Sequence, residues 1–257
     1  MEIYTKIEKY NVCLPTIISI PKTISINKII VICYGFNGNR SEEHKLIINF
    51  TKKAVKSGYI IVRFDYYGHG ISDGKYCETD ILSKLDNIRM VIEYLEGCFR
   101  NDDIEITLLG ISDGGRLATQ IASENNKVKN IVCWNPLFEL AECLNDNYFK
   151  ILNRMKTINF CGMEISTKYY TQMLNLISVN VFLELNINKI CFFGDKDKLT
   201  LDTQKKLIER DGPLDFIKNG NHLFNDVDSE KLIIDKTIKW LCGNKKNDYK
   251  RWNNNKQ

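Results

Sequence analysis

Short apolar segments rich in β-branched residues alternate with helical patterns along most of this 257-residue chain. The strand-like runs cover residues 29–34, 59–65, 104–109, 129–134, 189–193 and 214–217. Segments with helical spacing cover residues 41–57, 79–96, 114–124, 203–210 and 230–241. Such alternation is typical of a mainly parallel sheet with helices on both faces. The sequence therefore predicts an α/β fold.

Two parts of the chain depart from this rhythm. The first 28 residues form two extended segments around Lys9-Tyr10-Asn11, which predicts an antiparallel hairpin at one edge of the sheet. Residues 136–188 lack an obvious central strand and carry many aromatic residues, which predicts a small helical lid. We therefore expect a core of residues 1–136 and 189–243, a lid or cap insertion of residues 137–188, and a polar flexible tail of residues 244–257.

Composition excludes several classes of protein. The 36 basic and 32 acidic residues are too evenly balanced for a nucleic-acid binder. The sequence shows neither a secretory signal nor a run of the roughly 20 apolar residues that a membrane span requires. The nine cysteines include no Cys-x-x-Cys pair, which favours a reduced, cytoplasmic protein over a disulfide scaffold or a zinc site.

The segment Gly110-Ile111-Ser112-Asp113-Gly114 lies between a strand-like run and a helical pattern. Small residues around Ser112 permit a sharp strand-to-helix turn that lifts its hydroxyl clear of the sheet. The same turn aims the helix N-terminus at negative charge that develops during a reaction. An ordinary glycine-rich turn is the structural alternative. The flanking elements favour the interpretation that Ser112 is a nucleophile.

A serine hydroxyl needs a base, and the chain offers three histidines. His44 falls in the first turn of the predicted helix 41–57, where we expect an exposed position. His69 lies between two glycines and is expected to hydrogen-bond to loop backbone. His222 follows the last strand-like run on the loop Gly220 to Phe224 and is therefore the expected base.

The acid that orients the base is expected between nucleophile and base in the chain, because this order is typical of a serine on a strand-to-helix turn. The segment Phe193-Gly194-Asp195-Lys196-Asp197 follows a strand-like run and offers two carboxylates. Asp197 is favoured because it lies far enough from the turn glycine to reach back to the imidazole. Asp195 remains the alternative.

Five segments together resemble the α/β-hydrolase superfamily. They are most similar to its esterase, lipase and acylaminopeptidase-like branch, which contains monoacylglycerol lipases and cinnamoyl or feruloyl esterases. The similarity extends from about residue 29 to 241 and is weak through the insertion. The segments are Tyr34–Gly38, Arg63–Gly74, Gly110–Gly114, Gly194–Asp197 and Gly220–Phe224.

The resemblance implies an α/β-hydrolase fold and an oxyanion hole formed by the backbone N–H groups of Phe36 and Asp113. The Asp113 side chain has three interpretations: it influences His222, it prefers a cationic group nearby, or it is an acid favoured at a helix N-terminus. Residues expected to contact the substrate are Tyr34, Phe138, Tyr169, Tyr170 and Met173.

The function expected on these grounds is hydrolysis of an acyl or aryl carboxylic ester through a Ser-His-Asp triad and an acyl-enzyme intermediate. A thioesterase or acyltransferase that takes an acyl group from CoA or a carrier protein is the enzymatic alternative, and peptidase activity stays open. A ligand-binding homologue without catalysis is the alternative of another class. We expect a small-molecule substrate and neither a metal nor an organic cofactor.

Overall fold

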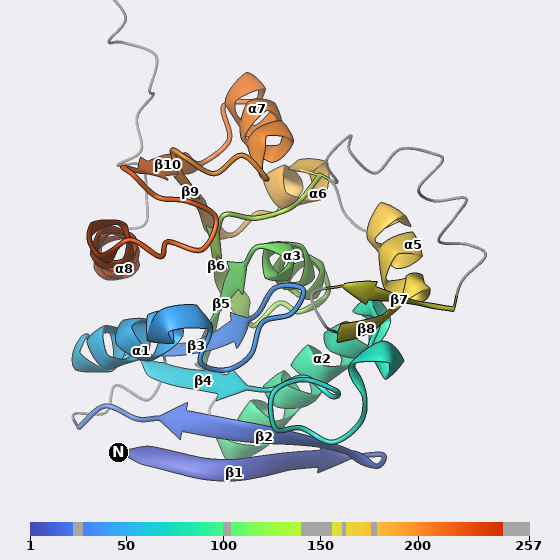
Figure 1. The fold of residues 1–257 in the computed structure, drawn as a ribbon. Coiled ribbons are helices and arrows are strands. Elements are labelled where there is room, and N and C mark those ends of the chain that lie inside the picture. Colours follow the sequence, from blue (N-terminus) through green and yellow to red (C-terminus); the bar gives the residue numbers. More distant parts are fainter. Residues whose placement is uncertain (23–27, 100–103, 140–155, 161–162, 176–178, 244–257) are drawn as a thin grey trace, which may run out of the picture.

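The structure is a computed structural model that describes residues 1–22, 28–99, 104–139, 156–160, 163–175 and 179–243. Its centre is an eight-stranded sheet in the order β1-β2-β4-β3-β5-β6-β9-β10 (Figure 1). The β1–β2 and β2–β4 pairs are antiparallel, and the other pairs are parallel. The strands are β1 (Glu2–Lys9), β2 (Val12–Ser19), β3 (Lys28–Cys33), β4 (Ile60–Phe64), β5 (Glu105–Ile111), β6 (Val128–Trp134), β9 (Asn188–Gly194) and β10 (Leu214–Ile217).

Helices cover both faces of the sheet, as the alternating pattern predicts. On one face α1 (Leu46–Lys56) packs against α8 (Val227–Cys242). On the other, α2 (Ile81–Cys98) packs against α3 (Asp113–Glu124), with α7 (Leu201–Glu209) towards the β10 edge (Figure 1). None of the described helices is both long and apolar enough to cross a bilayer.

The predicted edge hairpin is confirmed, and its turn explains its register. Tyr10 and Asn11 both have positive φ, at 49° and 64°. Two consecutive residues of this kind form the tight turn whose twist matches that of a two-stranded antiparallel ribbon. Because the turn is only two residues long, Lys9 pairs directly with Val12.

The start of the first helix differs from the sequence prediction. Helix α1 begins at Leu46 rather than at residue 41, after the short 3₁₀ turn η1 (Glu43–Lys45). Glu42, His44 and Lys45 all have positive φ, which interrupts the helical backbone before α1. His44 therefore lies outside the helix, with its Nε2 3.4 Å from a carboxylate oxygen of Glu230 on α8.

The insertion is not wholly helical, so that expectation is corrected. Its described part contains the antiparallel hairpin β7 (Thr157–Phe160) and β8 (Met163–Ser166), then α5 (Thr167–Asn175) and α6 (Val179–Glu184). Four-residue strands are too short for their periodicity to stand out in the sequence. Residues 140–155 and the tail 244–257 lie outside the described residues. The domain boundaries stay a prediction.

The carboxyl ends of the central strands are fixed by a buried aromatic cluster. Trp134 ends β6, and its ring centroid lies 5.3 Å from that of Phe50 on α1 and 6.4 Å from that of Phe224. Its indole N–H donates a 2.9 Å hydrogen bond to Thr237 Oγ1 on α8. The carboxyl end of β6, where Trp134 lies, is therefore packed against α1 and α8, the two helices on one face of the sheet.

Helix α3 approaches the end of β3 so closely that only glycine fits at position 114. A methyl group at Gly114 would lie 2.0 Å from the carbonyl oxygen of Cys33 and 2.7 Å from that of Tyr34. Both atoms belong to the backbone, so neither can rotate away. The position of α3 on the sheet therefore depends on position 114 being a glycine, which has no side chain.

We expect Gly114→Ala to lower the free energy of unfolding by about 2 kcal/mol or more, because the added methyl overpacks a rigid contact. Gly97→Ala is the matched control, since a methyl there meets nothing within 4 Å and the residue lies in α2. That control should be more stable than the wild type by about 0.5–1 kcal/mol. Urea unfolding measures both, and a Gly114→Ala protein of wild-type stability would contradict the packing described.

Candidate active site

Ser112 lies at the sharp turn between β5 and α3. Its backbone has φ 53° and ψ −123°, a conformation that residues with a side chain seldom adopt. The surrounding chain holds it there, because its N–H donates to the Trp134 carbonyl at 2.9 Å. Its own carbonyl accepts from Gly115 N at 3.0 Å and Leu137 N at 3.1 Å. The hydroxyl consequently stands at the carboxyl edge of the sheet, beside the N-terminus of α3.

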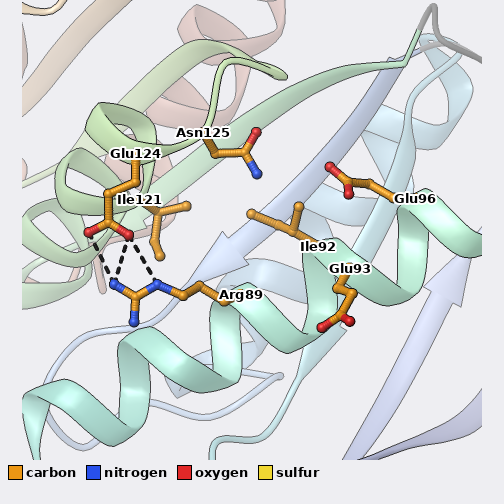
Figure 2. Close-up of a pocket in the computed structure, with 7 residues that line it drawn as sticks. All are labelled: Arg89, Ile92, Glu93, Glu96, Ile121, Glu124 and Asn125. Atoms are coloured by element: carbon orange, nitrogen blue, oxygen red, sulfur yellow. Dashed lines mark hydrogen bonds and ion pairs between the residues drawn. The ribbon is translucent and has the colours of Figure 1, made fainter.

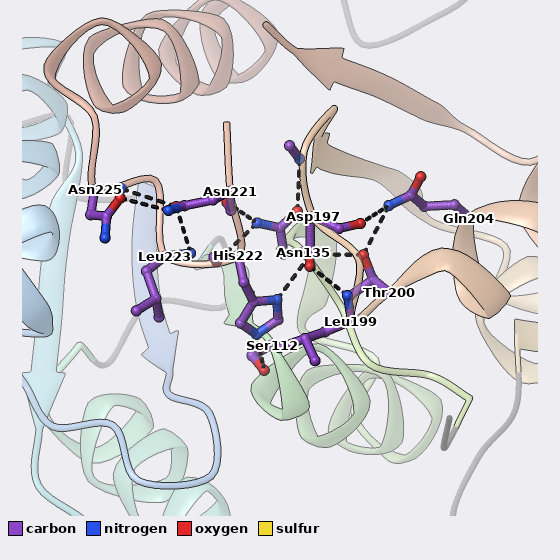
Figure 3. Close-up of polar contacts among 11 residues, drawn as sticks. Ser112, Asn135, Asp197, Leu199, Thr200, Gln204, Asn221, His222, Leu223 and Asn225 are labelled. Atoms are coloured by element: carbon purple, nitrogen blue, oxygen red, sulfur yellow. Dashed lines mark hydrogen bonds and ion pairs between the residues drawn. The ribbon is translucent and has the colours of Figure 1, made fainter. Parts of the chain in front are cut away.

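The structure brings Ser112, His222 and Asp197 together (Figure 3). His222 Nε2 lies 2.9 Å from Ser112 Oγ, and His222 Nδ1 lies 2.9 Å from Asp197 Oδ2. The three residues come from the ends of β5 and β9 and from the loop after β10. An imidazole that contacts a hydroxyl through one nitrogen and a carboxylate through the other can take the hydroxyl proton while the carboxylate holds its tautomer.

Asp197 is held in position by more than His222. Its side chain is fully buried; Oδ1 accepts the Leu199 N–H at 2.9 Å, and Oδ2 accepts the Thr200 hydroxyl at 2.8 Å. Asp195 is exposed instead, and its N–H bonds to the Ile217 carbonyl. Of the two carboxylates that the sequence offered, it is therefore Asp197 that meets the imidazole.

Asn135 links the acid turn to the histidine loop. Its fully buried side chain accepts a 2.8 Å hydrogen bond from Gly194 N. Its amide nitrogen donates to the carbonyls of Asn221 at 3.0 Å and His222 at 2.9 Å (Figure 3). The residue has φ 45°, which asparagine tolerates better than most side chains. One amide thus fixes the backbone on both sides of the His222–Asp197 contact.

The segment after β3 passes directly beside Ser112. A methyl group at Gly35 would lie 3.1 Å from Ser112 Cβ and 3.6 Å from its hydroxyl oxygen. The next backbone N–H, that of Phe36, therefore belongs to a peptide adjacent to the hydroxyl. The Asp113 N–H is the first of α3, where backbone donors have no partner within the helix. These are the two backbone donors that the family resemblance implies for an oxyanion hole.

The side chain of Asp113 is buried and bonded to the insertion. Its Oδ2 accepts a 2.6 Å hydrogen bond from the Tyr169 hydroxyl on α5, and its Oδ1 lies 3.2 Å from Arg116 Nε. Burial, together with the neighbouring carboxylate, raises the pKa of Tyr169 well above its usual value. A buried carboxylate is stabilised by such a cation and hydroxyl donor. Asp113 therefore joins the insertion directly to the turn that carries Ser112.

The side chains expected to contact a substrate occupy different environments. Tyr34 is fully buried against Phe64 and Tyr66, so its ring offers no surface to a ligand. Phe138 is buried against Phe182, with ring centroids 5.0 Å apart. Tyr169 is buried too, and its ring packs edge-on against Phe36 at 4.7 Å. The side chains of Tyr170 and Met173 lie outside the described residues, and their contact with substrate stays a prediction.

His69 bonds to loop backbone in the structure. Its ring nitrogens lie 3.2 Å from the Tyr67 carbonyl oxygen and 3.3 Å from that of Phe36. Burial and the nearby cation of Lys84 lower the pKa of His69 to about 3. The imidazole is therefore neutral at physiological pH and helps to shape the segment that carries Phe36.

A concave surface lies away from this centre. It is a groove of about 270 Å³ between α2 and α3, lined by Arg89, Glu93, Glu96 and Glu124 among others (Figure 2). Arg89 crosses it to bind Glu124 with contacts of 2.7–3.0 Å. Within the described residues no cluster of histidine, cysteine or carboxylate side chains could hold a metal ion.

The sequence model of the family described as serine aminopeptidase, S33, matches residues 25–230. The chain belongs to this family of α/β hydrolases. Among curated proteins, a 31.7 kDa Escherichia coli protein from the traX-finO intergenic region is 32% identical over 104 residues, which are 40% of this chain and 35% of that protein. The quorum-quenching protein AidA of Acinetobacter baumannii is 24% identical over 58% of this chain and 46% of its own length. The matches thus span less than half of either relative.

Solved structures of similar fold cover nearly the whole chain. Est1E from Butyrivibrio proteoclasticus with bound ferulic acid has a TM-score of 0.76 at 18% identity, covering 92% of this chain and 97% of its own. Mouse α/β hydrolase domain-containing protein 10 has a TM-score of 0.70 at 16% identity, covering 93% and 98%. At these identities the likeness concerns the α/β-hydrolase fold alone.

Sequence reasoning missed Asn135 and the Tyr169–Asp113 contact. Asn135 directly follows a strand-like run, at the sheet edge where α/β hydrolases place their functional groups, and this position was the available signal. No sequence signal indicated that Tyr169, 56 residues beyond Asp113, would bond to it. Contacts of this kind depend on how the insertion packs onto the core.

We expect Asn135→Ala to lower the free energy of unfolding by about 2–4 kcal/mol, because it leaves the buried Gly194 N–H and two part-buried carbonyls without the amide. Asn135→Gly is the companion variant, since it removes the same hydrogen bonds without a side chain at positive φ. Urea unfolding should place the glycine variant between alanine and the wild type. Wild-type stability in both would contradict the linking role.

Proposed function

We propose that this protein is a serine hydrolase that cleaves a carboxylic ester through an acyl-enzyme intermediate on Ser112. The observation that carries the proposal is the continuous pair of 2.9 Å contacts from Ser112 through His222 to Asp197. Membership of a hydrolase family supports it.

In the first half-reaction, His222 Nε2 accepts the hydroxyl proton as Ser112 Oγ attacks the substrate carbonyl. Asp197 stabilises the imidazolium and keeps Nδ1 protonated. The Phe36 and Asp113 N–H groups bind the oxyanion, and the N-terminus of α3 adds its dipole. His222 then donates its proton to the departing alkoxide, which leaves an acyl group on Ser112.

In the second half-reaction water replaces the alcohol. His222 takes a proton from the water as it attacks the acyl carbonyl, and the same backbone donors hold the second oxyanion. Collapse of this intermediate returns the proton to Ser112 Oγ and releases a carboxylic acid. Neither half-reaction needs a metal or an organic cofactor.

The apolar groups around the site suit an ester with an acyl or aryl substituent. Phe36 is half-buried beside Gly35, while Leu199 and Leu223, the neighbours of the acid and the base, expose 58% and 39% of their surface. Apolar surface of this kind suits an acyl or aryl group. Est1E, which binds ferulic acid, shares the fold and makes an aromatic acyl group a reasonable first substrate class.

Hydrolysis of p-nitrophenyl acetate and labelling by a fluorophosphonate probe test this proposal. We expect Ser112→Ala to abolish labelling and to lower kcat by roughly 10⁴- to 10⁶-fold. Ser123→Ala is the control, because Ser123 is exposed on the same helix and bonds only to its own turn in the described contacts. Equal labelling of the wild type and Ser112→Ala would eliminate Ser112 as the nucleophile.

The same preparation separates an esterase from a thioesterase. The O-butyryl ester of N-acetylethanolamine and the S-butyryl thioester of N-acetylcysteamine carry the same acyl group and differ only in the leaving oxygen or sulfur atom. A higher kcat/KM for the oxygen ester supports the proposal. A strong preference for the thioester would instead identify a thioesterase that uses the same three residues.

A further inference from the structure

Lys84 is a fully buried lysine that the proposed mechanism leaves without a role. It is the fourth residue of α2 and exposes none of its surface. Lysine is among the residue types least often buried, because its ammonium loses strong hydration. A lysine in such a place needs specific partners, and its contacts lead to the segment beside Ser112.

The ammonium binds two consecutive carbonyl oxygens of that segment. Lys84 Nζ lies 3.0 Å from the Gly35 carbonyl oxygen and 2.7 Å from that of Phe36. It also lies 5.0 Å from the ring centroids of both Tyr66 and Tyr169, a distance at which a cation is attracted to an aromatic face. Carbonyl dipoles and aromatic rings thus replace the water that a surface lysine would keep.

The Gly35 carbonyl and the Phe36 N–H are the two ends of one peptide group. The described chain has no cis peptide bond, so these ends point in opposite directions. The N–H therefore points away from Lys84. Because Gly35 packs against Ser112, the peptide that Lys84 binds also lies beside the hydroxyl. A cation bound to the oxygen holds the peptide plane in one orientation and makes the N–H a stronger donor.

We propose that Lys84 is a positioning residue for the oxyanion hole. Its ammonium binds the Gly35 carbonyl oxygen and thereby fixes and polarises the Gly35–Phe36 peptide. The inference rests on the proposed function, since it assigns Lys84 to the N–H that would bind the oxyanion. Phe36 O also accepts from the Tyr76 hydroxyl and contacts His69, so the following peptide is held as well. Lys84 adds the bond to Gly35 O, on the peptide that carries the donor.

Charges from several elements act on the ammonium. Burial lowers the pKa of Lys84 to about 7, and Asp113 and Glu42 oppose this effect. The cation is therefore lost as the pH rises through about 7, and the polarisation of the Phe36 N–H is lost with it. The groups that face Lys84 are Glu42 before α1, Tyr66 and His69 after β4, Tyr76 in η2 (Tyr76–Glu78), Asp113 in α3 and Tyr169 in α5.

Lys84→Met tests the inference, because methionine keeps the length and apolar character of the side chain but has no donor. With p-nitrophenyl acetate we expect kcat to fall by roughly 10- to 100-fold with KM nearly unchanged, less than the loss of an oxyanion donor itself. Affinity for an aryl trifluoromethyl ketone, which forms a tetrahedral adduct on serine, should fall by a similar factor. A merely structural role would not couple these two quantities.

Arg89→Met is the matched control, since it removes a cation from the same helix at an exposed ion pair. It should keep wild-type kcat and inhibitor affinity. Inactive Ser112→Ala together with wild-type kcat in a folded Lys84→Met would overturn the role of Lys84 alone. Full activity in Ser112→Ala would overturn the proposed function and this inference with it.

A pH profile keeps the inference testable if Lys84→Met fails to fold. The ratio of the wild-type kcat to that of Lys84→Gln, a neutral donor, should decline severalfold as the pH rises through about 7 and then level off, because neutral Lys84 still donates hydrogen bonds but carries no charge. The ratio cancels the pH dependence that a histidine base gives to both proteins. A ratio that is constant from about pH 6 to about pH 9 would overturn the inference.

Discussion

The backbone of Ser112 is the constraint on which the rest of the site depends. Its positive φ is a strained conformation of the kind that costs about 1–3 kcal/mol and persists only where the surroundings enforce it. Here the Trp134 carbonyl, the first turn of α3 and the close approach of β3 at Gly114 enforce it. Because Trp134 is itself fixed by α1 and α8, core packing is transmitted directly to the position of one hydroxyl.

Buried polar side chains complete what the strained turn begins. Asn135 fixes the acid turn and the histidine loop, and Lys84 binds the segment that carries Phe36. Both side chains are fully buried, and the hydrogen bonds described for them are all to backbone groups. Backbone held in this way is preorganised, so little rearrangement is needed when charge develops. The hydrogen bond between Asp113 and Tyr169 then connects the turn that carries Ser112 to the insertion.

Much of the fold followed from the sequence because strand and helix periodicities were clear in the core. The strands and the edge hairpin were predicted within one or two residues in most cases, and the turn at Ser112 was visible from its flanking segments. The sequence placed the start of α1 too early, because three residues with positive φ precede the helix and no pattern of residue types indicated them. Hairpin β7–β8, Asn135 and Lys84 depend on contacts between distant segments, which periodicity does not encode.

The most direct test of the account is pre-steady-state hydrolysis of a p-nitrophenyl ester whose acyl-enzyme breaks down slowly, followed by intact-protein and peptide mass spectrometry. We predict a burst of p-nitrophenol equal to one equivalent per protein chain, with the acyl mass on the peptide that contains Ser112. Steady hydrolysis without a burst, in a protein that never carries the acyl mass even under rapid acid quench, would contradict it.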